Sequence, residues 1–213
     1  MEALVWLDYA GVALFAVSGA LAAARRGGDA VTFAFFAAVT GIGGGTMRDL
    51  ILDVPVFWVR DPGYVAVCLA AAALTWVGGA QQPAKKGSRL AILLWLDAVG
   101  MAAYAVVGAA KAAALGTPPV VCVVMGVLTA CFGGIVRDVL AGQPSVLLSR
   151  EIYVTAAGVG ATVYVVLKLL GLPDLVAALG GVAAGFALRA AALGWGWSLP
   201  SFRPDDRADP PTS

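Results

Sequence analysis

The chain has 213 residues, of which 61% are apolar and 13% are charged, and its net charge is +1 with no histidine. Soluble domains are about 45–50% apolar and about 25% charged, so this composition excludes an ordinary water-soluble fold. The near-neutral charge gives no reason to expect a nucleic-acid partner, and the lack of histidine excludes a histidine-based metal or acid–base site.

Seven apolar segments are long enough to cross a bilayer, which takes about 20 helical residues. Charged or Gly/Pro-rich turns separate them, and they cover 3–24, 30–52, 63–81, 90–113, 118–141, 152–171 and 174–194. The first is interpreted as a retained span, because no basic n-region of a signal peptide precedes it. Residues 197–213 are rich in charge and proline, which predicts a disordered cytoplasmic tail. The predicted fold is an all-α membrane protein with seven transmembrane helices.

Lysine and arginine gather on one side of the predicted spans. The richer side holds Arg25, Arg26, Lys85, Lys86, Arg89, Arg150, Arg189, Arg203 and Arg207, and the other holds Arg60, Lys111 and Lys168. The positive-inside rule then predicts that the N-terminus lies outside and the C-terminus lies in the cytoplasm. The membrane itself is expected to be an inner (plasma) membrane. The 85–89 cluster is explained equally well by binding of anionic lipid.

A constant offset of 89 residues relates the two halves of the chain. It pairs Trp6-Leu7-Asp8 with Trp95-Leu96-Asp97, and Gly44-Gly45 and Arg48-Asp49 with Gly133-Gly134 and Arg137-Asp138. Each unit holds three spans, an odd number, so the second enters the membrane from the opposite face. We predict a first repeat at 1–84, a second, inverted repeat at 85–172, and a seventh helix at 173–196 outside the repeats.

Glycine clusters interrupt the second and fifth spans near their middle, at Gly43, Gly44 and Gly45 and at Gly133 and Gly134. Glycine costs about 1 kcal/mol against alanine inside a helix, so each cluster needs a reason. Close helix packing is one reason. The other is a kinked or unwound helix whose carbonyl oxygens coordinate a cation in a wet cavity. Duplication at matching depth favours the second interpretation.

An Arg-Asp pair follows each glycine cluster, at Arg48-Asp49 and Arg137-Asp138. Charges within spans mark a pathway or a buried pair. In antiparallel hairpins that turn near Gly28 and Thr117, an aspartate of the first helix stands level with the arginine of the second. We therefore predict two structural ion pairs, Asp8 with Arg48 and Asp97 with Arg137. Asp49 and Asp138 are then expected to face a pore.

Two further features of the first and fourth spans allow alternative interpretations. Lys111 has no charged counterpart, since Ala22 stands at the equivalent position, so it is either a gating or selectivity charge at the pore or a lysine that reaches the outer surface. The small-residue runs Ser18-Gly19-Ala20 and Gly108-Ala109-Ala110 are interpreted as close packing against the broken helices. No Walker loop, GxGxxG turn or Ser–His pair is present, so an enzyme or ATP-driven pump is not expected.

The motif Asp8-Tyr9-Ala10-Gly11, the glycine cluster at 43–45 and the Arg-Asp pairs, in duplicate, resemble the prokaryotic trimeric intracellular cation (TRIC) channels over residues 5–195. The resemblance implies a homotrimer in which each subunit has its own pore between the repeats. It implies passage of K⁺, with Na⁺ as a second permeant ion, and no cofactor. It assigns kinks to the glycines of both clusters and pore-facing charges to Asp138 and Asp49. Phe132 departs from the pattern, so the second helix is expected to bend less.

Inverted repeats with broken helices serve channels and transporters alike. A passive cation channel is therefore the leading hypothesis, and a secondary transporter of a small solute such as glycine is the alternative. A structural or assembly factor would not explain the duplicated Arg-Asp pairs. Subunit contacts are expected at the small-residue surfaces around Gly158-Val159-Gly160 and Gly180-Gly181, unless these form an internal packing seam.

Overall fold

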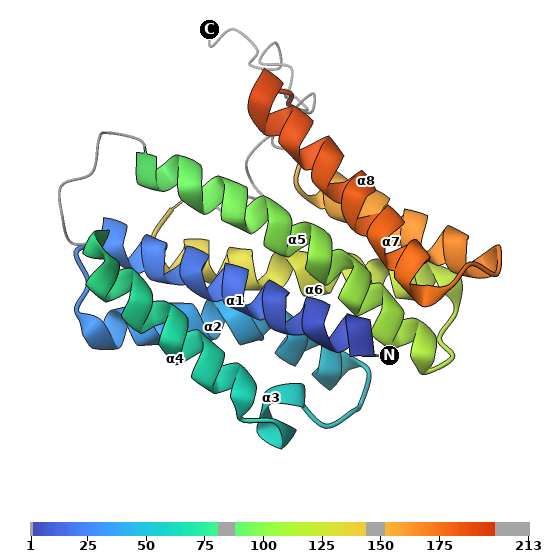
Figure 1. Cartoon of the computed structure of the whole chain (residues 1–213), viewed down its shortest axis with the longest axis horizontal. Helices are drawn as coiled ribbons and strands as arrows, with labels where there is room; N and C mark the ends of the chain where they lie inside the picture. The colour runs from blue at the N-terminus through green and yellow to red at the C-terminus, as the bar shows by residue number, and fades with distance from the viewer. Residues whose placement is uncertain (1, 81–87, 144–151, 199–213) are drawn as a thin grey trace, which may run out of the picture.

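The computed structural model describes residues 2–80, 88–143 and 152–198, and these fold into helices (Figure 1). In chain order they are α1 (Glu2–Arg25), α2 (Ala30–Ile51), the short α3 (Phe57–Arg60), α4 (Gly63–Thr75) with a π-helical turn η1 (Trp76–Ala80), α5 (Ser88–Ala114), α6 (Pro119–Leu140), α7 (Val154–Leu169) and α8 (Asp174–Trp195). The predicted basic residues Lys85, Lys86 and Arg150 and the tail from 199 onward lie outside the described residues.

Within the described residues, five helical segments are long and apolar enough to cross a membrane. They are Leu4–Arg25, Ala30–Ile51, Leu90–Ala114, Pro119–Leu140 and Asp174–Trp195. Two of the seven predicted spans coincide instead with shorter apolar helices, Gly63–Gly78 and Val154–Leu169. Many large apolar side chains are exposed on these helices, among them Val31, Leu74, Val120 and Leu179, as expected where hydrocarbon surrounds a protein.

The helices begin and end at residues whose chemistry explains the boundary. Asp29 caps α2, and its Oδ1 accepts hydrogen bonds from the Thr32 amide (2.8 Å) and hydroxyl (2.7 Å). Pro119 occupies the first turn of α6, where a missing N–H costs nothing. Gly196 ends α8 in the left-handed conformation with a φ of 67°.

Helices α1, α2, α5 and α6 form a central four-helix group. Their main contacts follow the order α1–α2–α6–α5–α1, and α1 also touches α6. Helix α4 packs on α1 and α2, whereas α7 and α8 pack on α5 and on each other (Figure 1). The segment α4 and the pair α7/α8 therefore flank the central group.

Helices α2 and α6 cross with their backbones in contact. A Cβ atom at Gly44 would collide with the carbonyl oxygen of Thr129, and one at Gly133 would collide with that of Thr40. Residue 44 thus lies level with 129 and residue 40 with 133, so the two helices run antiparallel. Both helices are continuous α-helix through the glycines, so the backbone is not unwound there and the glycines permit close approach.

The glycines at 160, 181 and 185 form a packing seam between α7 and α8. A Cβ at Gly160 would lie 3.0 Å from the carbonyl oxygen of Gly181, and one at Gly185 would lie 3.3 Å from the Cα of Gly160. These residues join α7 to α8, which assigns Gly160 and Gly181 to packing within the subunit rather than to a contact between subunits.

Candidate functional site

Two buried clusters of charged side chains lie in the central four-helix group. Arg48 and Asp49 follow the crossing point on α2, and Arg137 and Asp138 follow it on α6. Because the helices are antiparallel there, the two pairs point toward opposite ends of the group. Counting from the level of Gly44 at 1.5 Å per residue separates Arg48 from Arg137 by about 18 Å along the axis. Both therefore fit within a hydrocarbon core about 30 Å thick.

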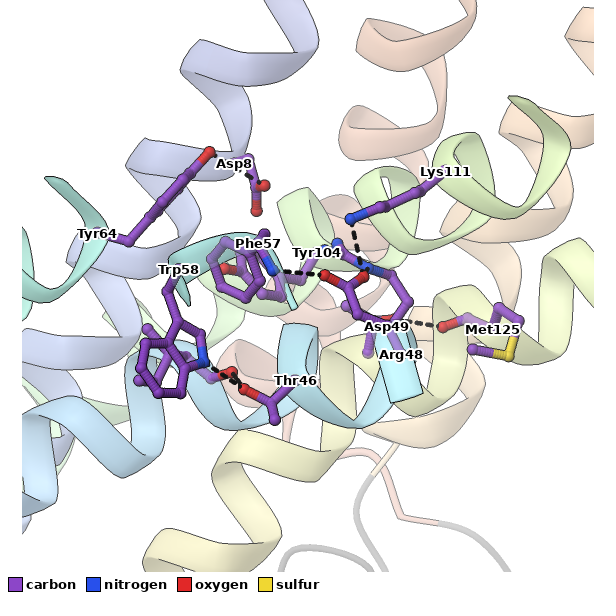
Figure 2. A network of polar contacts seen from close by, with 12 residues as sticks. Asp8, Thr46, Arg48, Asp49, Phe57, Trp58, Tyr64, Tyr104, Lys111 and Met125 are labelled. Carbon is purple, nitrogen blue, oxygen red and sulfur yellow. Dashed lines mark hydrogen bonds and ion pairs between the residues drawn. The ribbon is translucent and has the colours of Figure 1, made fainter. Parts of the chain in front are cut away.

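The first cluster is centred on the carboxylate of Asp49 (Figure 2). Asp49 is fully buried, and its Oδ1 lies 2.7 Å from Arg48 Nε and 2.8 Å from Lys111 Nζ. The backbone amide of Phe57 donates to Oδ2 at 2.9 Å. Asp49 thus has partners from α2, α3 and α5. That it faces a pore stays a prediction. Lys111 reaches inward to Asp49 rather than outward to the membrane surface.

The short helix α3 closes this cluster on one side. Its Phe57 ring is 9% exposed and lies 5.4 Å from the Arg48 guanidinium carbon, in the geometry of a cation–π contact. A Cβ at Gly45 would meet the same ring at 3.0 Å from its Cζ. Trp58 donates from Nε1 to the Thr46 hydroxyl at 2.9 Å and fastens α3 to α2. The lack of a side chain at Gly45 therefore leaves room for the Phe57 ring.

The predicted ion pair between Asp8 and Arg48 is not formed. Arg48 turns to its neighbour Asp49, and both of its terminal nitrogens are buried without a hydrogen-bond partner. Asp8 accepts a hydrogen bond from the Tyr64 hydroxyl at Oδ2 (3.3 Å), while its buried Oδ1 has no partner. The physical reason is that Asp49, the next residue in the chain, also binds Lys111 and the Phe57 amide, and the guanidinium group of Arg48 pairs with this carboxylate instead of with Asp8.

The second cluster is centred on the guanidinium of Arg137. Its Nη1 lies 2.5 Å from Asp97 Oδ1 and donates to the Ser18 hydroxyl at 2.6 Å, and its Nε donates to Asp138 Oδ1 at 2.9 Å. Arg137 thus bridges two carboxylates from α5 and α6 and a hydroxyl from α1. Asp97 is the partner that the hairpin register indicates, and Asp138 is itself an ion-pair partner with 8% of its surface exposed.

The glycines of the two clusters have different surroundings. Gly44, Gly45, Gly133 and Gly134 are buried, and Gly43 is only half-buried. A Cβ at Gly134 would lie 3.4–3.7 Å from Tyr153, Asp97 and Arg137, which is ordinary contact distance. One at Gly43 would lie 3.9 Å from the nearest atom, the Cα of Gly133. Only some of the predicted kink positions therefore demand glycine in this conformation.

Several contributing residues were not predicted for these roles. Ser18 was assigned to packing, yet its hydroxyl joins the second cluster. Arg189 of α8 was counted as a cytoplasmic charge, yet it is 2% exposed and its guanidinium carbon lies 5.1 Å from the centre of the Tyr153 ring. Tyr64 and Tyr153 stand at equivalent positions, 89 residues apart. This match is the sequence signal that could have identified the two tyrosines as neighbours of the clusters.

The two clusters differ in the arrangement of their charged groups. In the first, Arg48 and Lys111 both contact the carboxylate of Asp49. In the second, Arg137 contacts the carboxylates of Asp97 and Asp138. Within the described residues, no three His, Cys, Asp or Glu side chains are grouped to hold a resident metal.

A family model described as "Glycine transporter" matches residues 5–79 and 94–168. Each bound of the second range lies 89 residues after that of the first. The UPF0126 inner membrane protein YadS of Escherichia coli K12 is 38% identical over 203 residues, covering 94% of this chain and 97% of the relative. A UPF0126 membrane protein of Vibrio cholerae is 38% identical over 202 residues, covering 93% and 82%.

Solved structures of TRIC channels share the fold. The TRIC channel orthologue from Rhodobacter sphaeroides is 48% identical, with a TM-score of 0.87 over 92% of this chain and 100% of the other. A second TRIC cation channel is 30% identical, with a TM-score of 0.81 over 93% and 97%. These relatives are described as membrane proteins or channels rather than enzymes, and the protein described here is a multi-pass membrane protein.

Proposed function

The chain belongs to the family described as glycine transporters and, by sequence and fold, to the prokaryotic TRIC channels, and from that premise we propose that it is a passive channel for monovalent cations. The observation that carries the proposal is the pair of buried charged clusters at opposite ends of one four-helix group. Ionisable groups at such depth are costly, and they usually mark a pathway or a buried pair. Here they are paired, and their duplication in the two halves of the chain supports a role in a pathway.

The proposed pathway runs inside the group formed by α1, α2, α5 and α6. It passes from the cluster around Asp49, across the layer of Thr40 and Thr129, to the cluster around Arg137. Both threonines are buried, and their carbonyl oxygens face the glycines of the partner helix. Separation of α2 and α6 at this crossing, by bending at the glycines, would turn these oxygens toward a permeating ion. Potassium is the proposed main permeant ion, with sodium second.

Lys111 is the proposed gating charge. Its ammonium group lies on Asp49 at 2.8 Å, in the position that a permeant cation would take at that carboxylate, and its side chain is 32% exposed. A tethered cation at this point excludes a mobile one by charge repulsion and by volume. Opening of the pathway would then require Lys111 to leave Asp49.

The finer architecture is also proposed. We infer two inverted three-helix repeats at 1–84 and 85–172, seven membrane spans and a C-terminal cytoplasmic tail. The two matched ranges of the family model and the reciprocal contacts of Gly44 and Gly133 support this arrangement. The similar structures are trimeric channels, which supports a homo-oligomer. We propose a homotrimer with one pore per subunit, in an inner membrane, with the N-terminus outside.

The test is current recording from the purified protein in planar bilayers under a KCl gradient. Discrete openings that reverse near the potassium equilibrium potential are expected. Asp138→Asn removes one carboxylate of the second cluster and should lower conductance several-fold. Gly134→Leu should abolish current, because its side chain enters the contacts among Tyr153, Asp97 and Arg137. Lys111→Met should raise open probability. Arg60→Met, on the exposed surface of α3, is the matched control.

The family description favours one competing function, secondary transport of glycine. The same proteoliposomes decide between the two. Saturable accumulation of labelled glycine without unitary currents would replace the channel proposal. Potassium flux unaffected by glycine would remove the transporter.

A further inference from the structure

A groove between α1 and α8 lies apart from the charged clusters. It has a volume of about 390 Å³, within the range of small-ligand sites of about 300–1,000 Å³. Leu4 and Leu7 line one wall, and Leu175, Leu179 and Val182 line the other. Helices α1 and α8 both pack on α5 but barely touch each other, which leaves this space between them.

The groove begins where two spans begin. Figure 1 shows the N-terminus and the start of α8 at the same end of the molecule. Its lining runs from Leu4 to Ala10 on α1 and from Asp174 to Val182 on α8, so it extends about 12 Å from the starts of the spans at 1.5 Å per residue. That is the depth of the upper part of a phospholipid acyl chain. Trp6 lines it and is 74% exposed, as befits an aromatic residue at headgroup level.

The mouth of the groove carries one charge of each sign. Asp174 is the polar member of the lining, and its Oδ1 lies 2.5 Å from Lys168 Nζ. The side chains are 47% and 35% exposed, so both remain accessible. An ammonium and a carboxylate side by side complement a headgroup that itself carries a phosphate and an ammonium. An anionic headgroup would gain the lysine but would be repelled by the aspartate.

We propose that this groove binds one zwitterionic, amine-bearing phospholipid of the phosphatidylethanolamine type. One acyl chain lies between α1 and α8, the phosphate contacts Lys168, and the headgroup ammonium contacts Asp174. The inference is independent of ion conduction, because none of these residues belongs to the charged clusters.

The test is native mass spectrometry of the detergent-solubilised full chain, titrated separately with phosphatidylethanolamine and phosphatidylglycerol. One phosphatidylethanolamine per subunit is expected, bound at least fivefold more tightly than phosphatidylglycerol. Leu175→Trp fills the groove and Lys168→Ala removes the phosphate contact, and each should weaken binding about tenfold. Leu74→Trp, at a 74% exposed position on α4, is the matched control and should bind as wild type does.

Three results would overturn the proposal. Equal binding of the two lipids would remove the role of the charged mouth. Unchanged phosphatidylethanolamine binding in both Leu175→Trp and Lys168→Ala would place the lipid elsewhere. Loss of the oligomer in Leu175→Trp, with lipid binding retained, would show that a second copy of the chain occupies the groove.

Discussion

Replacing Gly44 with alanine tests the close contact between α2 and α6. The new Cβ would collide with the carbonyl oxygen of Thr129 and would lie 3.2 Å from its carbonyl carbon, whereas ordinary contact begins at 3.4 Å. Overfilling a packed interior costs about 1–3 kcal/mol, and alanine returns about 1 kcal/mol of helix propensity. The neighbouring Gly43→Ala gains the same propensity, but its Cβ meets nothing closer than 3.9 Å.

The two variants should therefore differ by about 1–3 kcal/mol in stability, although the chemical change is identical. For a chain of this size, 1 kcal/mol corresponds to about 2–4 °C in melting temperature. We expect Gly44→Ala to melt several degrees below Gly43→Ala when both are heated in the same detergent and followed by tryptophan fluorescence. Gly133→Ala, which meets the Thr40 carbonyl, should resemble Gly44→Ala. Equal melting of Gly44→Ala and Gly43→Ala would refute the contact.

Three further outcomes are expected. Arg137→Met removes the cation that contacts the buried carboxylates of Asp97 and Asp138 and should cost about 3–5 kcal/mol of stability. Arg60→Met on the exposed α3 should change stability by no more than about 0.5 kcal/mol in the same melting assay. Hydrogen bonds from the first turn of α2 lower the pKa of Asp29 below 3.8. The ionised cap therefore stabilises the protein fully above pH 3.8 and loses this effect as the pH falls through the lowered pKa. Asp29→Ala should melt at a lower temperature than wild type at pH 6, and the difference should shrink toward pH 3; an unchanged difference would contradict this. Gly160→Val should destabilise the packing of α7 on α8. Gly158→Val should not, because its Cβ meets only a side chain at 3.8 Å. The measurement is the detergent concentration or the temperature at which each variant aggregates.

The helices were largely predictable because the apolar runs and their Gly/Pro punctuation carry that information locally. The segments 30–52, 118–141 and 174–194 agree with α2, α6 and α8 to within two residues at each end. The segment 63–81 was predicted as one span, but the α-helix ends at Thr75 and continues as the π-turn η1, which contains Gly78 and Gly79. Glycine lowers the cost of that change in hydrogen bonding.

The site was predictable only as far as the depth of each residue in the helix. Counting from the turns gives the level of a side chain but neither its direction round the helix nor its rotamer. That information sufficed for Asp97 and Arg137. It failed for Arg48, because Lys111 has no counterpart in the other half and the Phe57 amide belongs to the short helix α3. Such contacts depend on tertiary packing that no repeat offset encodes.

The reciprocal contact of α2 and α6 has the form of an isologous interface, as found in symmetric homodimers. Gly44 contacts Thr129 and Gly133 contacts Thr40, so the two halves of the chain contribute equivalent surface patches to this contact. A three-helix fragment would therefore carry both sides of this surface. Joining two such surfaces in one polypeptide makes their association independent of protein concentration. It also lets each side change alone, and Lys111 is one such change, because Ala22 stands at the equivalent position of the first half.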